Sequence, residues 1–173
     1  MESTVIIPEN TGLEVLEHLS YQRGILWENI EIFLNQLSKV EGVAIAGTKE
    51  MDTIYPVKHN LEDGLYTREL FIPKGHLVVS YIHKQNHPSF LLKGDISILL
   101  DSGEIQRLKA PQKVFTKIGT QRVCYTHEDV TWVCVYKTRC KKIKSIEKEI
   151  YTLNYKELPM KIINKQLKSW QEQ

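Results

Sequence analysis

The chain contains 173 residues, of which 42% are hydrophobic; this is enough for one well-packed domain with appendages and short for two. Its 23 lysines and arginines nearly balance its 21 aspartates and glutamates, so no overall field attracts nucleic acid or a membrane surface. No segment approaches the ~18 apolar residues that span a bilayer, and the first residues carry no charged and apolar leader. We therefore expect a soluble, cytoplasmic protein. Its three cysteines are odd in number and lack C-x-x-C spacing, which favours reduced thiols.

Residues 1–42 are predicted to form an amphipathic helical segment. Leucines recur at helical spacing from Leu13, and after Gly24 a second apolar stripe extends to Leu37. Thr11 is expected to cap the first helix and Gly42 to end the second. The apolar stripe packs either against the core of the same chain or against a partner protein. Packing against the main body is favoured, because a helix pair must cover its apolar face.

Residues 43–137 change to a β pattern. Short runs rich in valine, isoleucine, tyrosine and threonine alternate with turn sequences such as Asp101-Ser102-Gly103. The predicted strands are 43–46, 66–72, 77–83, 89–92, 95–100, 105–110, 113–116, 121–126 and 131–136. No helix-length crossover separates them, so the pattern predicts a mainly β sandwich or barrel and not a parallel sheet.

Residues 138–173 are predicted to be a helical tail. It begins with a basic cluster that we interpret as a solvated surface and not as a phosphate-binding stripe. Ile143, Ile146 and Ile150 form a helical stripe, and a second short helix follows Pro159 and ends near Trp170.

The stretch from Pro73 to Gly94 has the clearest organisation, with a turn, an apolar run, a corner containing two histidines, a second apolar run and a closing glycine. This layout predicts two strands joined by a polar corner. Its spacing resembles the first motif of the cupin family, in which a glycine, a His-x-His pair, a glutamate and a glycine recur at fixed intervals. The matching positions here are Gly75, Tyr81, His83, His87 and Gly94. Tyr81 takes the place of the first histidine, and His87 takes that of the glutamate.

The spacing of Gly119, Arg122 and Thr126 resembles that of a second cupin motif, with Arg122 in the usual histidine position. The phrases around His83 and from Arg122 to Asp129 are also similar to those of short cupin-like proteins of bacterial and bacteriophage genomes. The resemblance implies a cupin-like double-stranded β-helix, or jelly roll, flanked by the amphipathic and tail helices. It also implies a homodimer or larger homo-oligomer.

Alternate residues of a strand share a face, so the resemblance places Tyr81, His83 and Arg122 inside the barrel. Buried polar groups need partners, which are either a bound ligand or one another and water at the barrel mouth. A guanidinium donates hydrogen bonds and cannot ligate a metal, so Arg122 favours a small anionic ligand, a carboxylate or a phosphate. The candidate ligand-binding residues are Arg68, Tyr81, His83, His87, Arg122, Tyr125, His127 and Trp132.

Two other functions stay open from the sequence. His83, His87 and His127 are candidate ligands for Zn, Fe or Ni, which would suit a metal-dependent cupin enzyme of the oxygenase or isomerase type. Alternatively, a phage-encoded structural or inhibitory protein would act through its helical appendages by protein contact. The substrate and the biological partner do not follow from the sequence.

Overall fold

The computed structural model describes residues 12–21, 30–39, 43–48, 51, 54–100 and 103–164. The expected cap residues Thr11 and Gly42, and the end of the tail helix near Trp170, lie outside these ranges. Within the described part of the chain, no helix is long and apolar enough to cross a membrane.

Twelve strands make up the body of the described structure, and most follow the predicted ones. Their bounds are β1 Val43–Ile45, β2 Val57–Glu62, β3 Leu65–Ile72, β4 Leu77–Val79, β5 Ile82–His83, β6 His87–Lys93, β7 Asp95–Leu99, β8 Ile105–Lys109, β9 Gln112–Thr116, β10 Val123–Thr126, β11 Val130–Lys137 and β12 Tyr151–Thr152. The predicted run 77–83 is divided into β4 and β5, while β2 and β12 were not predicted.

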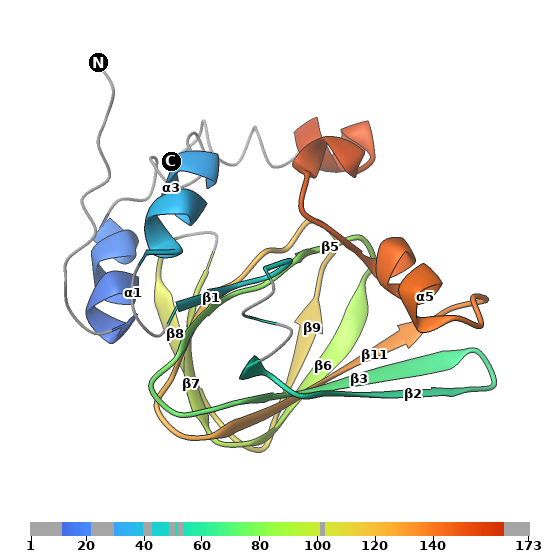
Figure 1. The fold of residues 1–173 in the computed structure, drawn as a ribbon, viewed down its shortest axis with the longest axis horizontal. Helices are drawn as coiled ribbons and strands as arrows, with labels where there is room; N and C mark the ends of the chain where they lie inside the picture. Colours follow the sequence, from blue (N-terminus) through green and yellow to red (C-terminus); the bar gives the residue numbers. More distant parts are fainter. Residues whose placement is uncertain are drawn as a thin grey trace.

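Two five-stranded sheets form the barrel, with strand orders β1-β4-β10-β7-β8 and β2-β3-β11-β6-β9 (Figure 1). The short strands β5 and β12 make a separate antiparallel pair. Neighbours in both large sheets are antiparallel except β1 and β4, which pair in parallel. The predicted mainly β, jelly-roll architecture is confirmed, with this one parallel pair as the difference.

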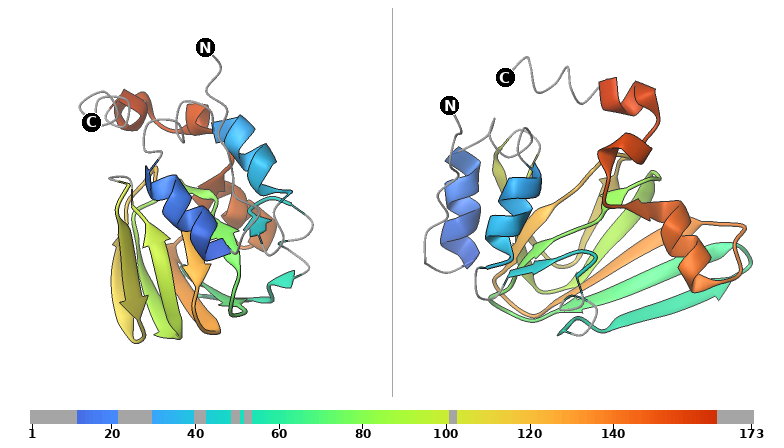
Figure 2. Two further views of the ribbon diagram at one scale, coloured as in Figure 1. Left: turned by 90° about the vertical axis from the view of Figure 1, so that its left-hand side faces the viewer. Right: turned by 45° about the horizontal axis from the view of Figure 1, so that its top comes forward.

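Helices α1 (Gly12–Tyr21) and α3 (Ile30–Leu37) cover the outer face of the first sheet (Figure 2). Val15, Leu16 and Leu37 are fully buried in one cluster with residues of that sheet. The sheet residues of this cluster are Ile45, Leu77, Val79, Leu99 and Val123. The apolar helical stripe therefore packs against the barrel, as favoured from the sequence.

Helix α5 (Ile143–Ile150) lies at the opposite end of the barrel from α1 and α3 (Figure 1). Ile146 and Ile150 are fully buried, and they pack in one cluster with Tyr66, Tyr136 and Tyr151. The chain then forms β12, a 3-10 turn η1 (Tyr155–Glu157) and a helical stretch at 160–164. The tail thus closes over one end of the barrel.

Candidate ligand-binding cavity

One wall of the barrel interior comes from two long paired strands. In the register of β3 and β11, Leu70 lies opposite Trp132, and Arg68 lies opposite Cys134. These four side chains all line a cavity, because alternate residues of a strand point to the same face. On this wall Arg68 lies two residues along β3 from Leu70, next to the apolar pair of Leu70 and Trp132.

The facing wall comes from the other sheet. Cys124 pairs with Val78, and both line the cavity. One step along, the backbone N–H of Ser80 donates to the carbonyl of Arg122 at 2.9 Å, and these two residues line it as well. The cavity has a volume of about 80 Å³. The described residues that line it are Met51, Arg68, Leu70, Ile72, Val78, Ser80, Tyr81, His83, Ile96, Arg122, Cys124, Trp132, Cys134 and Tyr151.

Two arginines reach this cavity without a carboxylate partner among the described residues that line it. Arg122 donates from Nη2 to the hydroxyl of Thr116 at 2.9 Å, and its guanidinium carbon lies 5.9 Å from the Trp132 ring centre. The guanidinium carbon of Arg68 lies 5.7 Å from the ring centre of Tyr151. Arg68 Nε is buried and has no hydrogen-bond partner among the described residues. The described lining of the cavity therefore contains two cationic guanidinium groups and no carboxylate.

His83 joins the cavity to a buried group of aromatic side chains. Its Nδ1 lies 3.2 Å from the hydroxyl of Tyr136, which donates to the hydroxyl of Tyr151 at 2.9 Å. The ring centres of His83 and His87 are 4.7 Å apart, and His87 Nδ1 lies 3.1 Å from the carbonyl of Gln85. His87 thus contacts His83, which lines the cavity, but is not itself part of the described lining.

Burial keeps both histidines uncharged at neutral pH. Burial lowers the pKa of His83 well below its usual value, and the nearby His87, Arg122 and Arg68 lower it further. Burial likewise lowers the pKa of His87 to about 4. Burial raises the pKa of the Cys124 thiol to about 12, so this cavity residue is a neutral thiol as well. The formal positive charge of the cavity therefore rests on the two arginines.

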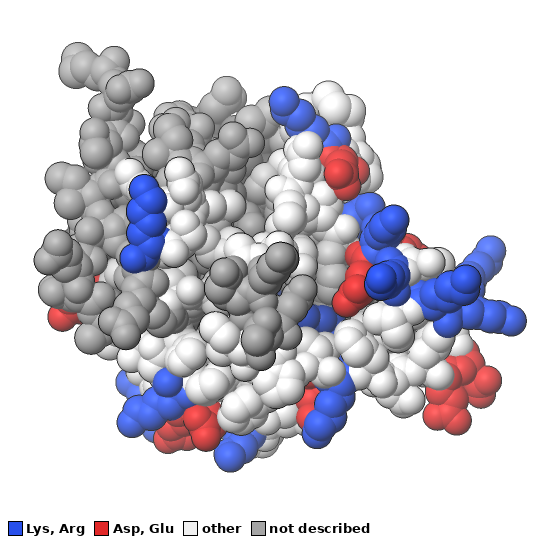
Figure 3. All heavy atoms as spheres, in the orientation of Figure 1, with Lys and Arg blue, Asp and Glu red and all other residues white. Residues whose placement is uncertain are grey.

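A wider outer hollow of about 320 Å³ adjoins the cavity on the side of α5. Arg68, Tyr81 and Tyr151 line both spaces, and the rings of the two tyrosines stack with their centres 5.1 Å apart. The other residues of the hollow are Lys144, Glu147, Lys148, Thr152 and Leu153. Basic and acidic side chains are interspersed over this end of the molecule (Figure 3). The shared residues mark the mouth of the cavity.

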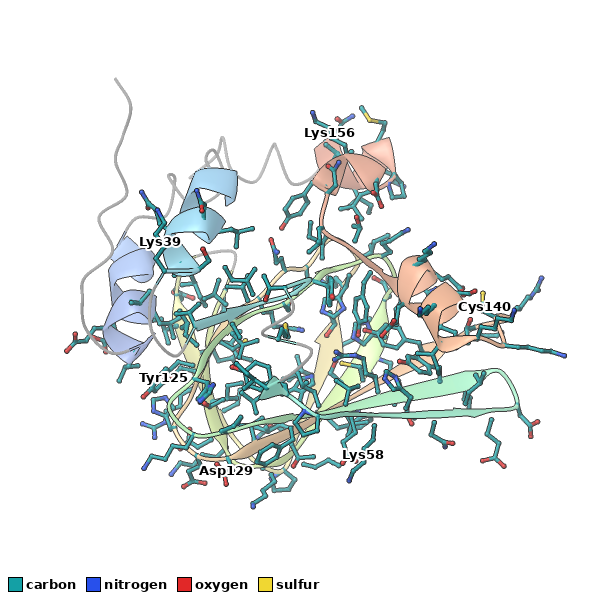
Figure 4. All side chains as sticks on the ribbon, in the orientation of Figure 1. Lys39, Lys58, Tyr125, Asp129, Cys140 and Lys156 are labelled. Carbon is teal, nitrogen blue, oxygen red and sulfur yellow. The ribbon has the colours of Figure 1, made fainter. Side chains whose placement is uncertain are left out.

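Five of the eight residues predicted to bind a ligand line the cavity: Arg68, Tyr81, His83, Arg122 and Trp132. His87 lies beside His83 but is not part of the lining, and Tyr125 and His127 lie elsewhere. Tyr125 packs against the cluster that α1 and α3 form on the outer face of the first sheet (Figure 4), and its ring is edge-on to His127 at 5.1 Å. The reason is strand alternation, because Tyr125 follows the inward-facing Cys124 and so faces outward.

The three histidines predicted to hold a metal are not brought together. His127 Nε2 lies 2.7 Å from the hydroxyl of Ser97, a β7 residue on the outer face, while His83 and His87 lie at the inner side of the barrel. In the described ranges, no three histidine, cysteine, aspartate or glutamate side chains are grouped as metal ligands. The donor set therefore does not fit the expected three-histidine centre.

Sequence reasoning missed two aromatic residues of the site. Tyr136 lies on the same face of β11 as Trp132 and Cys134, so strand alternation could have identified it. Tyr151 lies in the tail that was predicted to be helical, and it reaches the mouth only through the pairing of β12 with β5. No local pattern indicates that pairing.

The solved structures that are similar to the chain include cupin-domain proteins. No protein-family model and no curated protein sequence matches the chain. The cupin domain of an XRE family transcriptional regulator from Enterobacter cloacae is 16% identical, with 47% of this chain and 94% of that chain covered and a TM-score of 0.40. The EutQ protein of Clostridium difficile is 10% identical, with 49% of this chain and 68% of that chain covered and a TM-score of 0.41.

Ectoine synthase from P. lautus is 12% identical, with 69% of this chain and 85% of that chain covered and a TM-score of 0.47. These are distant similarities, with identities of 16% or less and TM-scores of 0.47 or less.

Proposed function

We propose that the protein binds a small anionic molecule inside its barrel, with Arg122 and Arg68 as the groups that hold the negative charge. The observation that carries this proposal is the pair of guanidinium groups around one cavity whose described lining includes no carboxylate. A buried charge without a partner is costly, and an anion from solution supplies that partner. The buried Nε of Arg68, which has no hydrogen-bond partner in the described part of the chain, is a further donor for it.

The neutral histidines are consistent with this ligand. His83 lines the cavity and, uncharged at neutral pH, offers either a lone pair or an N–H to a bound molecule. Tyr81 and Trp132 add an aromatic wall, which suits a ligand with some apolar surface. Tyr125 and His127 are not part of this proposal, because they face away from the cavity.

The test is a calorimetric titration of the purified protein with inorganic phosphate, sulfate and simple carboxylates. Arg122→Gln should weaken binding at least about tenfold, because a charge-assisted hydrogen bond contributes roughly 1.5–3 kcal/mol. Arg139→Gln is the matched control, since Arg139 is an exposed arginine of the tail and should bind as the parent does. Failure of every anion to bind, or equal affinity in Arg122→Gln, would contradict the proposal.

A metal-dependent enzyme of the oxygenase or isomerase type is the second candidate. One observation favours it, namely that His87 Nε2 is buried without a partner among the described residues, beside His83. The separate position of His127 and the cationic Arg122 weigh against it. Elemental analysis of the untagged protein beside a His83→Ala/His87→Ala variant decides the matter, since stoichiometric metal that is lost in the variant would support this candidate.

The oligomeric state is a separate part of the proposal. We expect a homodimer or larger homo-oligomer, as the cupin resemblance implies. Analytical ultracentrifugation measures this directly, and a monomer at all concentrations would contradict it.

A further inference from the structure

The cavity changes character along the barrel axis, and each level can be followed in the strand register. On β3, the inward residues in order are Ile72, Leu70 and Arg68, and their partners on β11 are Val130, Trp132 and Cys134. On the facing sheet, Ile96 pairs with Thr126, and the next level contains Val78 and Cys124. Both walls therefore run from aliphatic residues toward an arginine.

The aliphatic ends of the two walls meet. Thr126, the partner of Ile96, donates from its hydroxyl to the carbonyl of Pro73 at 2.6 Å, and Pro73 directly follows Ile72. All the aliphatic residues at this end belong to one packed cluster, which we call the cavity floor: Leu70, Ile72, Val78, Ile96 and Val130. Four of these five line the cavity, all except Val130.

The two arginines also lie at one level. Arg122 bonds Thr116, and the hydroxyl of Thr116 lies 3.0 Å from that of Ser89. Ser89 pairs with Cys134 in the sheet, and Cys134 is the partner of Arg68. These contacts and register pairs place the two arginines, one on each of the facing walls, on the same side of the floor. We call this level the arginine tier.

We infer that the ligand is an amphipathic anion, with its charged head at the arginine tier and an aliphatic tail that extends onto the cavity floor. This inference rests on the proposed function and names the class of ligand. The outer hollow adjoins the cavity beside Arg68, Tyr81 and Tyr151, on the arginine side. The tail therefore enters first, and the head stays near the mouth.

A floor of this kind recognises the tail by length. Each methylene that leaves water for the floor should tighten binding about fourfold, as long as the cavity has room for it. The cavity of about 80 Å³ limits this gain to short chains. Longer tails must either displace floor side chains or leave the head away from the arginines.

The experiment is a calorimetric series of straight-chain carboxylates from acetate to octanoate. We expect affinity to rise by about fourfold per carbon, pass through a maximum and then fall. Alkyl phosphates of the same lengths form a second series. A similar maximum in either series supports the inference, and the stronger series identifies the head group.

Two floor variants move the maximum in opposite directions. Val78→Phe fills the floor, so the best chain becomes shorter, and Ile96→Ala enlarges it, so the best chain becomes longer. Val133→Phe is the matched control, because Val133 lies between the inward residues Trp132 and Cys134 and faces the other side of β11. It should leave the length preference unchanged. Should Val78→Phe fail to fold, Ile96→Ala still tests the direction.

The outcomes separate this inference from the proposed function. Affinity that does not depend on chain length, while Arg122→Gln abolishes binding, would overturn the amphipathic ligand and leave the anion site standing. A length maximum that neither floor variant moves would overturn the assignment of the tail to the floor. No binding in either series would overturn both proposals.

Discussion

At the residue scale, Gly94 shows why the spacing of the central motif is demanding. It joins β6 to β7 with a φ of +94°, in the left-handed region that side chains rarely adopt. A Cβ atom at this position would also collide with the carbonyl oxygen of Asp129. The closing glycine of the motif is therefore required by both conformation and close packing.

Gly94→Ala should lower the free energy of unfolding by about 2–5 kcal/mol, from the left-handed backbone and the collision together. Gly75→Ala is the matched control, because Gly75 has a φ of +82° and open space at the Cβ position. It should cost only about 1–2 kcal/mol. Urea unfolding measures both, and equal losses would show that the contact with Asp129 is not decisive.

Also at the residue scale, His87 makes stability depend on pH. Burial lowers its folded pKa from 6.5 to about 4, so the unfolded chain binds more protons than the folded protein between these values. The stability from this group is therefore complete above pH 6.5 and falls as the pH drops toward 4. His83, whose pKa is lowered in the same direction, adds to the effect.

We expect the loss from His87 to reach about 3 kcal/mol across this window. Urea unfolding at a series of pH values measures it in the parent protein and in His87→Gln. The variant removes the titrating group and should show a shallower dependence on pH. The same slope in both proteins would mean that His87 is not the buried neutral group described above.

At the scale of elements, α5 holds the mouth of the cavity in place. The side chain of Ile146 is fully buried, with 0% of its surface exposed, and it packs in the cluster that contains Tyr136 and Tyr151. Ile146→Ala should cost about 2–5 kcal/mol of unfolding free energy, because it leaves a cavity beneath the helix. Ser145→Ala, at an exposed position of the same helix, should change stability by less than about 0.5 kcal/mol. Comparable losses in the two variants would contradict the packing role of Ile146.

The elements also differ in how well their sequences predict them. Strand β7 was predicted from its apolar residues, and all five of its residues are buried. Ile96 and Ile98 pack in the inner cluster, and Leu99 packs with α1 and α3. Strand β2 was missed because it lies at a sheet edge and has no buried residue, so it lacks an apolar alternation. Strand β12 has two residues and exists through its pairing with β5.

At the scale of the whole molecule, the net charge conceals the main electrostatic feature. The formal charge of +2 indicates no preference for anions, because charges of both signs are spread over the chain. Folding then brings Arg68 and Arg122 to one cavity, whereas Arg107 and Lys109 are paired with Asp95 elsewhere. The cavity therefore differs from these ion pairs in that its described lining has no carboxylate beside the arginines, a difference that the total charge does not reveal.

Strand periodicity, turn residues and the spacing from Gly75 to Gly94 were enough to predict the mainly β architecture, because all three act through local backbone geometry. It also identified five residues of the cavity, because alternation along a strand decides which side chains share a face. Three features became clear only from the folded chain: Tyr125 and His127 lie outside the cavity, Tyr151 lies at its mouth, and both arginines lie on the same side of an aliphatic floor. These relations depend on pairings between distant strands, and no local pattern along the chain encodes them.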